Sequence, residues 1–204
     1  MSAVFARDVA TVYAYGNNCV ALASEHGFDP WAARGRILQG WADAQRGEAT
    51  TGIARIHDGL AAIEATGARR IPLFLTLLAE ALAFAGKTEE ALTALDDALA
   101  KAAVSGERGS NAEIDRLCGE LTARLPDPDP AKAEESFRTA LEIAREQGTR
   151  GYELRRHELR RLWRDQGRRG EARELLAPVY GWFTEGFDTQ DLKEAKALLE
   201  ELAA

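Results

Sequence analysis

The chain has 204 residues, and its 33 acidic and 26 basic side chains give a formal net charge of −7 at pH 7. It contains 38 Ala and 24 Leu against 6 Val and 7 Ile. Because Ala and Leu are strong helix formers whereas β-branched residues favour strands, this composition argues against a sheet-based fold and most dinucleotide-binding and P-loop enzymes. The negative charge disfavours a general nucleic-acid binder but leaves room for a local basic patch.

The sequence shows no targeting signal and no metal-site pattern. No apolar run reaches the roughly 20 residues of a membrane span, and the N-terminus lacks the basic-then-apolar order of a signal peptide. Cys19 and Cys118 are too few for a disulfide scaffold and show no metal-ligand spacing with His26, His57 or His157. We therefore expect a cytoplasmic protein without a metal ion or other cofactor.

Glycines recur along the chain at a nearly constant spacing. Gly27, Gly67, Gly106, Gly148 and Gly186 are separated by 40, 39, 42 and 38 residues. Each follows a polar stretch at the end of a helix-forming run, which is where a glycine commonly ends a helix in the left-handed conformation. The spacing therefore predicts a helical repeat of about 40 residues.

Each period is divided by a second set of small residues. Gly47, Gly86 and Gly167 lie near the middle of a period, and five residues after them come Gly52, Ala91 and Ala172. Counting from those small residues, positions +4 and +7 are apolar or small, which is the spacing of one helix face. In the third period the Pro126–Pro130 stretch displaces this pattern to Ala133. Each period is thus predicted to form two antiparallel helices around a tight turn.

Start signals help to place the individual helices. Asp29-Pro30 and Asp129-Pro130 place a capping acid before a proline at the first helical position, and Ser110–Glu113 has the form of a capping box. Pro178 predicts a kink or break near residues 175–179. The expected helices are 8–26, 30–46, 49–66, 71–85, 88–105, 110–124, 130–147, 151–166, 169–185 and 189–203.

These helices are expected to stack into one domain covering residues 1–204, because a single hairpin cannot bury its apolar face alone. The predicted parts are a helix of a truncated preceding repeat (1–28), four repeats (29–67, 68–106, 107–148, 149–186) and a C-terminal capping helix (187–204). The aromatic residues after Pro178 are expected to cover the terminal repeat, with a dimer surface as the alternative. They are Tyr180, Trp182, Phe183 and Phe187.

The small-residue skeleton resembles the tetratricopeptide (TPR) repeat. That pattern has a small residue in the first helix, Gly at the turn, and small, large apolar and small residues along the second helix. The sets that match are Gly40, Gly47, Gly52, Ile56, Gly59; Ala79, Gly86, Ala91, Leu95, Ala98; Gly119, Ala133, Phe137, Ala140; and Gly167, Ala172, Leu176, Val179. The fourth set departs from the pattern at Arg160. The resemblance implies an all-α, TPR-like right-handed solenoid.

A second resemblance covers nearly the whole chain. Residues 37–42, 77–81, 140–145 and the long stretch 162–195 look like the C-terminal TPR-like region of large bacterial signalling proteins. Those proteins combine a class III adenylate/guanylate cyclase domain, a STAND-type ATPase module and a helical repeat array. The resemblance implies a sensor or scaffold region without catalytic residues of its own, and the sequence contains no P-loop motif.

In TPR stacks the first helix of each pair lines a concave groove, which predicts a partner-binding site. The residues placed on that face are Trp41, Glu80, Arg116, Glu120, His157, Arg161 and Arg164. Arginines there could hold carboxylates of an extended peptide. The alternative is structural: Arg116 and Glu120 pair with each other, and Trp41 packs between repeats.

An arginine-rich segment suggests a different partner. Residues 145–173 carry ten Arg against five acids, a net charge of +5 that leaves −12 for the rest of the chain. This segment could bind an anionic ligand or nucleic acid, dock on a second copy, or form a solvated helix face. The leading hypothesis is a noncatalytic protein-interaction scaffold within a cyclase or ATPase signalling protein. The alternative is an anion- or nucleic-acid-binding module that uses residues 145–173.

Overall fold

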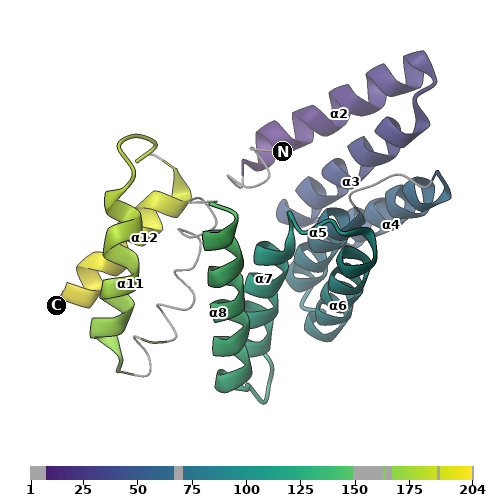
Figure 1. The fold of residues 1–204 in the computed structure, drawn as a ribbon. Helices are drawn as coiled ribbons and strands as arrows, with labels where there is room; N and C mark the ends of the chain where they lie inside the picture. The colour runs from purple at the N-terminus through teal and green to yellow at the C-terminus, as the bar shows by residue number, and fades with distance from the viewer. Residues whose placement is uncertain (1–7, 67–70, 149–162, 164–166, 188, 204) are drawn as a thin grey trace. The chain divides into compact units, whose positions relative to one another are not determined.

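The computed structural model describes residues 8–66, 71–148, 163, 167–187 and 189–203. It separates into two compact units, Met1–Ser110 and Asn111–Ala204, and each unit is described here by itself. All regular secondary structure in the described part of the chain is helical (Figure 1). The expectation of an all-α fold is therefore confirmed.

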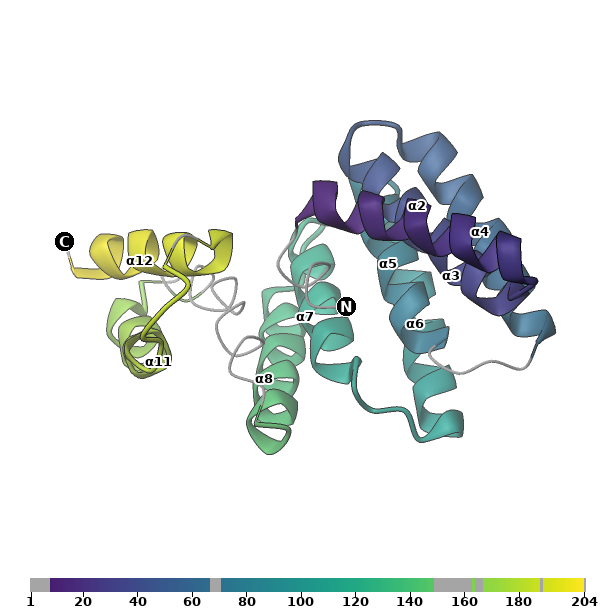
Figure 2. The same cartoon turned by 90° about the horizontal axis from the view of Figure 1, so that it is seen from above.

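The first unit is a succession of antiparallel helices. They are α2 (Val9–His26), α3 (Asp29–Gln45), α4 (Ala49–Ala65), α5 (Ile71–Phe84) and α6 (Thr88–Ser105). Helix α3 packs against both α2 and α4, and α5 packs against α4, α6 and α3 (Figures 1 and 2). The observed ends differ from the predicted ones by at most one residue, so the periodicity located these helices correctly.

The second unit contains two helix pairs. They are α7 (Asn111–Ala123) with α8 (Pro130–Glu146), and α11 (Arg169–Gly181) with α12 (Gln190–Ala203). The members of each pair lie side by side in both views (Figures 1 and 2). The predicted helix at 151–166 falls outside the described residues, apart from Trp163, which belongs to a helix and is buried.

Local signals explain where several helices begin and end. Gly27 and Gly106 follow α2 and α6 in the left-handed conformation, with φ of 70° and 73°, as the glycine spacing predicted. Asp129 caps α8 by accepting a hydrogen bond from the Lys132 amide at 3.0 Å. The corresponding prediction for Asp29 is wrong, because Phe28 occupies the cap position of α3 and Asp29 is the first helical residue. Its carboxylate is still close to the positive end of the helix.

The predicted effect of Pro178 also differs from the structure. Helix α11 runs through Pro178 without a break and ends at Gly181, four residues before the predicted end. Pro178 is exposed on this helix, so the carbonyl that loses its intrahelical partner can be hydrated. Of the predicted kink or break near residues 175–179, the break is therefore wrong.

Glycines allow three helices of the first unit to approach closely. A Cβ atom at Gly16 of α2 would lie 3.0 Å from the Gly35 carbonyl oxygen of α3, and one at Gly59 of α4 would lie 2.8 Å from the Ala33 carbonyl oxygen. In the second unit Gly119 of α7 leaves room for the Phe137 ring of α8. Gly59 and Gly119 belong to the small-residue sets that match the TPR pattern, whereas Gly16 lies outside them.

Each unit buries apolar side chains between its helices. In the first unit Ile37, Ile56, Ile63 and Leu95 are fully buried, and α5 is apolar on nearly every side. In the second unit Phe137, Leu176, Val179 and Leu192 belong to one core cluster together with Trp163. None of the described helices is both long and apolar enough to cross a membrane.

Candidate binding site

The structure brings two of the predicted groove residues together in the first unit. The Trp41 indole N–H on α3 donates a hydrogen bond to the Glu80 carboxylate on α5. Trp41 is only 1% exposed, whereas Glu80 is partly exposed. This agrees with the packing alternative for Trp41, because its ring is enclosed between successive hairpins and offers a partner no accessible surface.

Two further predicted groove residues meet in the second unit. The Arg116 guanidinium is 1% exposed and donates to Glu113 at 3.0 Å and to Glu120 at 2.7 Å. Glu120 also forms an ion pair with Arg124. The alternative that Arg116 and Glu120 pair with each other is confirmed. The remaining predicted groove residues, His157, Arg161 and Arg164, lie outside the described residues.

The arginine-rich segment is described only at its ends. Arg168 holds Glu171 through two hydrogen bonds of 2.8 and 2.7 Å and donates to Glu134 at 2.8 Å. The Trp163 indole donates to the same Glu134 oxygen at 2.8 Å, and the Arg168 guanidinium stacks 4.6 Å from the Trp163 ring centroid. Burial raises the pKa of Glu134, but these hydrogen bonds together with the charges of Arg138 and Arg168 outweigh it and leave the pKa lowered. This described arginine thus has a structural role.

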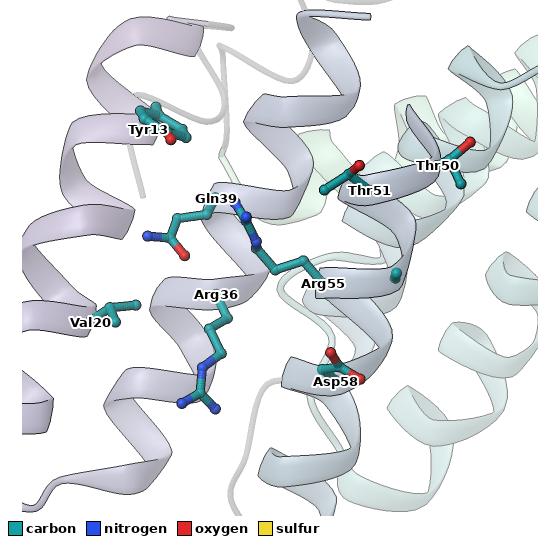
Figure 3. A pocket seen from close by; sticks show the side chains of 9 residues that line it. Tyr13, Val20, Arg36, Gln39, Thr50, Thr51, Arg55 and Asp58 are labelled. Atoms are coloured by element: carbon teal, nitrogen blue, oxygen red, sulfur yellow. The ribbon is translucent and has the colours of Figure 1, made fainter. Parts of the chain in front are cut away.

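An accessible hollow lies between α2, α3 and α4, and we call it the first hollow. Its volume is about 680 Å³, and it opens to solvent on one side (Figure 3). The lining side chains come from all three helices. They are Tyr13 and Val20 from α2, Arg36 and Gln39 from α3, and Thr50, Thr51, Ala54, Arg55 and Asp58 from α4.

Polar contacts hold part of this lining in place. Gln39 donates a hydrogen bond of 2.7 Å to Asn17 of α2. Arg55 reaches back to α3 and forms an ion pair with Asp43, whose side chain is 7% exposed. Burial raises the pKa of Asp43, although the Arg55 charge opposes this effect. Above Tyr13, the Arg46 guanidinium lies 4.1 Å from the ring centroid.

Arg36 differs from these residues because its guanidinium has no oppositely charged partner among the described residues. It is exposed on α3 and forms no ion pair within the described part of the chain, and Figure 3 shows its guanidinium extending between α3 and α4. The hollow therefore offers a guanidinium, two threonine hydroxyls and an apolar wall from Tyr13 and Val20. Guanidinium groups form strong paired hydrogen bonds with carboxylates.

A second hollow of about 600 Å³ lies between α4, α5 and α6, one hairpin further along. Leu60, Leu75, Leu78 and Leu82 form its apolar floor, and Glu64, Glu90 and Asp97 are among its rim residues. Lys101 contacts Glu64 at 3.2 Å, and Lys87 contacts Glu90 at 2.9 Å. Lysines thus balance these rim carboxylates, and the second hollow is mainly apolar, whereas the first is polar and contains the exposed Arg36.

No metal-binding cluster of His, Cys, Asp or Glu side chains is present among the described residues. Cys19 and Cys118 form no disulfide with each other, and both are partly buried. Burial raises the pKa of the Cys19 thiol, which donates a hydrogen bond of 3.1 Å to the Trp31 carbonyl.

The fold matches that of known repeat proteins. A crystal structure of a putative kinesin light chain from Podosopora anserina, described by its nearly identical TPR-like repeats, superposes with a TM-score of 0.62. The match covers 85% of this chain and 86% of that one at 18% identity. A variant of the same protein gives a TM-score of 0.59, covering 85% and 94% at 18% identity. The fold is tetratricopeptide-like.

Sequence comparison gives a more limited relationship. No protein-family model matches the chain. An uncharacterized protein of Rhizobium meliloti (strain 1021) is 32% identical over 142 residues. That stretch covers 69% of this chain but only 14% of the relative, so the chain spans a small part of the relative's length.

The TPR-like pattern did not identify the first hollow, although the sequence contains a signal for it. The two hairpins of the first unit align with an offset of 39 residues, which places Arg36, Gln39 and Asp43 opposite Leu75, Leu78 and Leu82. Polar residues at positions that are apolar in the next repeat could have marked this site. The prediction instead followed the face that begins with Trp41, which the structure buries.

Proposed function

We propose that this chain is a noncatalytic protein-interaction module. The observation that carries the proposal is the first hollow, where exposed polar side chains from three tightly packed helices surround an open volume of about 680 Å³. A rigid helical scaffold with accessible side chains suits recognition of a partner segment. The TPR-like fold supports the same reading, although a fold by itself does not establish a function.

The finer part of this proposal places the module in a bacterial signalling protein with cyclase and ATPase domains. The resemblance of residues 162–195 to such proteins supports it, and so does the match to a small part of a much longer relative. In this proposal the partner is a cyclase or ATPase domain of the same full-length protein. The gene sequence tests it directly: a gene encoding neither a cyclase nor a P-loop domain contradicts the link.

Anion or nucleic-acid binding by residues 145–173 is the second hypothesis, and Arg168 gives it no support because its guanidinium already binds Glu134 and Glu171. A salt titration separates the two. Nucleic-acid binding weakens steeply as salt rises, because phosphate contacts release counterions. We expect no such DNA binding by this chain.

In-cell photo-crosslinking tests the interaction module itself. A photoreactive amino acid replaces one exposed residue at a time: Thr50 in the first hollow, His57 in the second, or Trp182 in the second unit. A discrete adduct with another protein or domain at any of these positions supports the proposal. If the chain crosslinks to nothing at all three positions while remaining folded, the proposal fails.

A further inference from the structure

We propose that the first hollow binds an acidic segment of a protein partner, with Arg36 holding a carboxylate and the Tyr13–Val20 wall taking a neighbouring apolar side chain. This inference rests on the proposed function and specifies the chemistry of the partner. It concerns a different surface from the predicted groove around Trp41. The two hairpins of the first unit, α3–α4 and α5–α6, have equivalent residues at an offset of 39.

The two hollows are equivalent places in successive hairpins. An offset of 39 residues carries Arg36 onto Leu75, Gln39 onto Leu78, and Asp58 onto Asp97, and all six residues line their respective hollows. In the second hairpin these positions are occupied by packed leucines that are 4–7% exposed. The first hairpin has a charged and exposed Arg36 there instead.

Polar residues at these positions lower the stability of the first hairpin, and binding accounts for their presence. Three apolar floor positions have become Arg36, Gln39 and Asp43, so the first hairpin loses apolar burial that the second retains. Asp43 is matched internally by Arg55, and Gln39 by Asn17. Arg36 is the residue left without a counter-charge in the described part of the chain. Departures from the folding pattern without internal compensation are expected at functional sites.

The helix that borders the hollow shows the same contrast. Helix α6 begins with Glu89 and Glu90 in its first turn, where carboxylates stabilise the positive end of a helix. The equivalent residues of α4 are Thr50 and Thr51, and its first turn contains no acidic residue. The Glu90 carboxylate that borders the second hollow thus has no counterpart at Thr51 in the first, although Glu48 at the cap position of α4 still places a carboxylate at that helix end. Figure 3 shows Thr50 and Thr51 at the opposite end of the hollow from Arg36, so a partner segment that spans the hollow would reach both.

The rest of the lining favours a peptide segment over a simple anion. Asp58 lies on the α4 side of the hollow and repels an anion placed beside it, a multiply charged phosphate more strongly than a single carboxylate. Tyr13, Val20 and Ala54 provide apolar surface that an inorganic anion does not use. The volume of about 680 Å³ holds several side chains at once. A short segment with an acidic residue beside an apolar one satisfies all of these features.

The test uses a random 12-residue peptide library displayed on phage and selected against the full chain. We expect enriched peptides that contain Asp or Glu next to a large apolar residue. Each enriched peptide is then synthesised with a fluorophore, and its dissociation constant is measured by polarisation. An excess of sodium phosphate or of free glutamate should fail to displace the peptide. Complete displacement by either would show a site for small anions and overturn the proposal.

Matched variants locate the binding. Arg36→Gln should raise the dissociation constant of the peptide by about tenfold or more, because it removes a charge-assisted contact. Lys193→Gln, which removes one positive charge from exposed α12, should leave affinity unchanged. Thr51→Glu restores the acid found at Glu90 and should also weaken binding while keeping the fold. If no acidic peptide is enriched, or if Arg36→Gln and Thr51→Glu bind like the wild type, this inference fails. Crosslinking at His57 or Trp182 would then still support the interaction module.

Discussion

Gly40 on α3 and Gly52 on α4 face each other so closely that neither position has room for a side chain. A Cβ atom at Gly40 would lie 2.5 Å from the Gly52 carbonyl oxygen, and one at Gly52 would lie 2.3 Å from the Gly40 carbonyl oxygen. Both obstacles are backbone atoms, which cannot rotate aside as a side chain can. This contact sets the separation of the two helices that carry most of the first hollow.

Gly52→Ala should therefore destabilise the first unit. The added methyl group forces α3 and α4 apart, and overpacking of this kind costs about 1–3 kcal/mol. Urea unfolding followed by circular dichroism measures the change in the free energy of unfolding. Gly109→Ala is the control, because a Cβ atom there meets nothing within 4 Å. Equal stability of the Gly52→Ala variant and the wild type would contradict the close contact.

The hydrogen bond from Trp41 to Glu80 should stabilise the packing of α3 on α5. Glu80→Leu leaves the buried indole N–H without this acceptor, which should lower the free energy of unfolding by about 1–3 kcal/mol. Glu80→Gln retains an oxygen that can accept the bond and should lose less. Urea unfolding monitored by tryptophan fluorescence provides the comparison. A larger loss for Gln than for Leu would argue against this hydrogen bond.

Removing one partner of the Asp43–Arg55 ion pair should lower stability more than replacing both partners. Arg55→Ala leaves the buried Asp43 carboxylate unpaired and should destabilise the chain by about 2–3 kcal/mol at pH 7. The loss should shrink in acid, where protonation of Asp43 removes the unpaired charge. The double variant Asp43→Leu with Arg55→Ala reproduces the Leu82 and Ala94 pair of the second hairpin. It should recover the lost stability in the same unfolding assay, and failure to recover would show that the pair is not replaceable by packing.

Asp115 on α7 should make stability depend on pH. Burial raises the pKa of its carboxyl to about 6 from an ordinary value of 3.8. Between these values the folded chain holds more protons than the unfolded chain, so this group lowers stability as pH rises from about 4 to about 6. Asp115→Asn removes the effect and should be more stable than the wild type at pH 7, by about 1 kcal/mol after solvent screening.

The measurement for Asp115 is the stability difference between the two proteins across that pH range. The difference should be small below pH 4, grow as pH rises, and level off above pH 6 to 7. A difference that does not change with pH would contradict the raised pKa. Glu113→Gln would be a poor control, because Glu113 holds the buried Arg116.

Local pattern was sufficient to locate the helices. The glycine spacing placed α2 to α8 within about one residue of their observed ends, because each boundary depends on neighbouring residues in the chain. Pro178 shows the limit of this reasoning. A proline inside a helix lowers the stability of that helix. Leu176 and Val179 pack into the core of the second unit, and this packing lets α11 continue past Pro178.

The site required more than local pattern. The sequence placed four residues on the groove-facing side of successive first helices: Trp41, Glu80, Arg116 and Glu120. The structure joins them as two hydrogen-bonded pairs. It also buries Trp41 and Arg116, which removes both side chains from the surface. Helical spacing indicates which residues share a face, but it does not indicate how deeply a neighbouring helix covers that face.

By itself, the sequence determined an all-helical protein of repeated hairpins with small residues at the helix contacts. Composition and periodicity are properties of the chain, and they act over a few turns of helix. Only the tertiary structure decided that Arg36 is exposed in an open hollow while Trp41 is enclosed. The physical reason is that burial depends on side chains brought together from helices far apart in sequence, as when Glu80 reaches Trp41 across 39 residues.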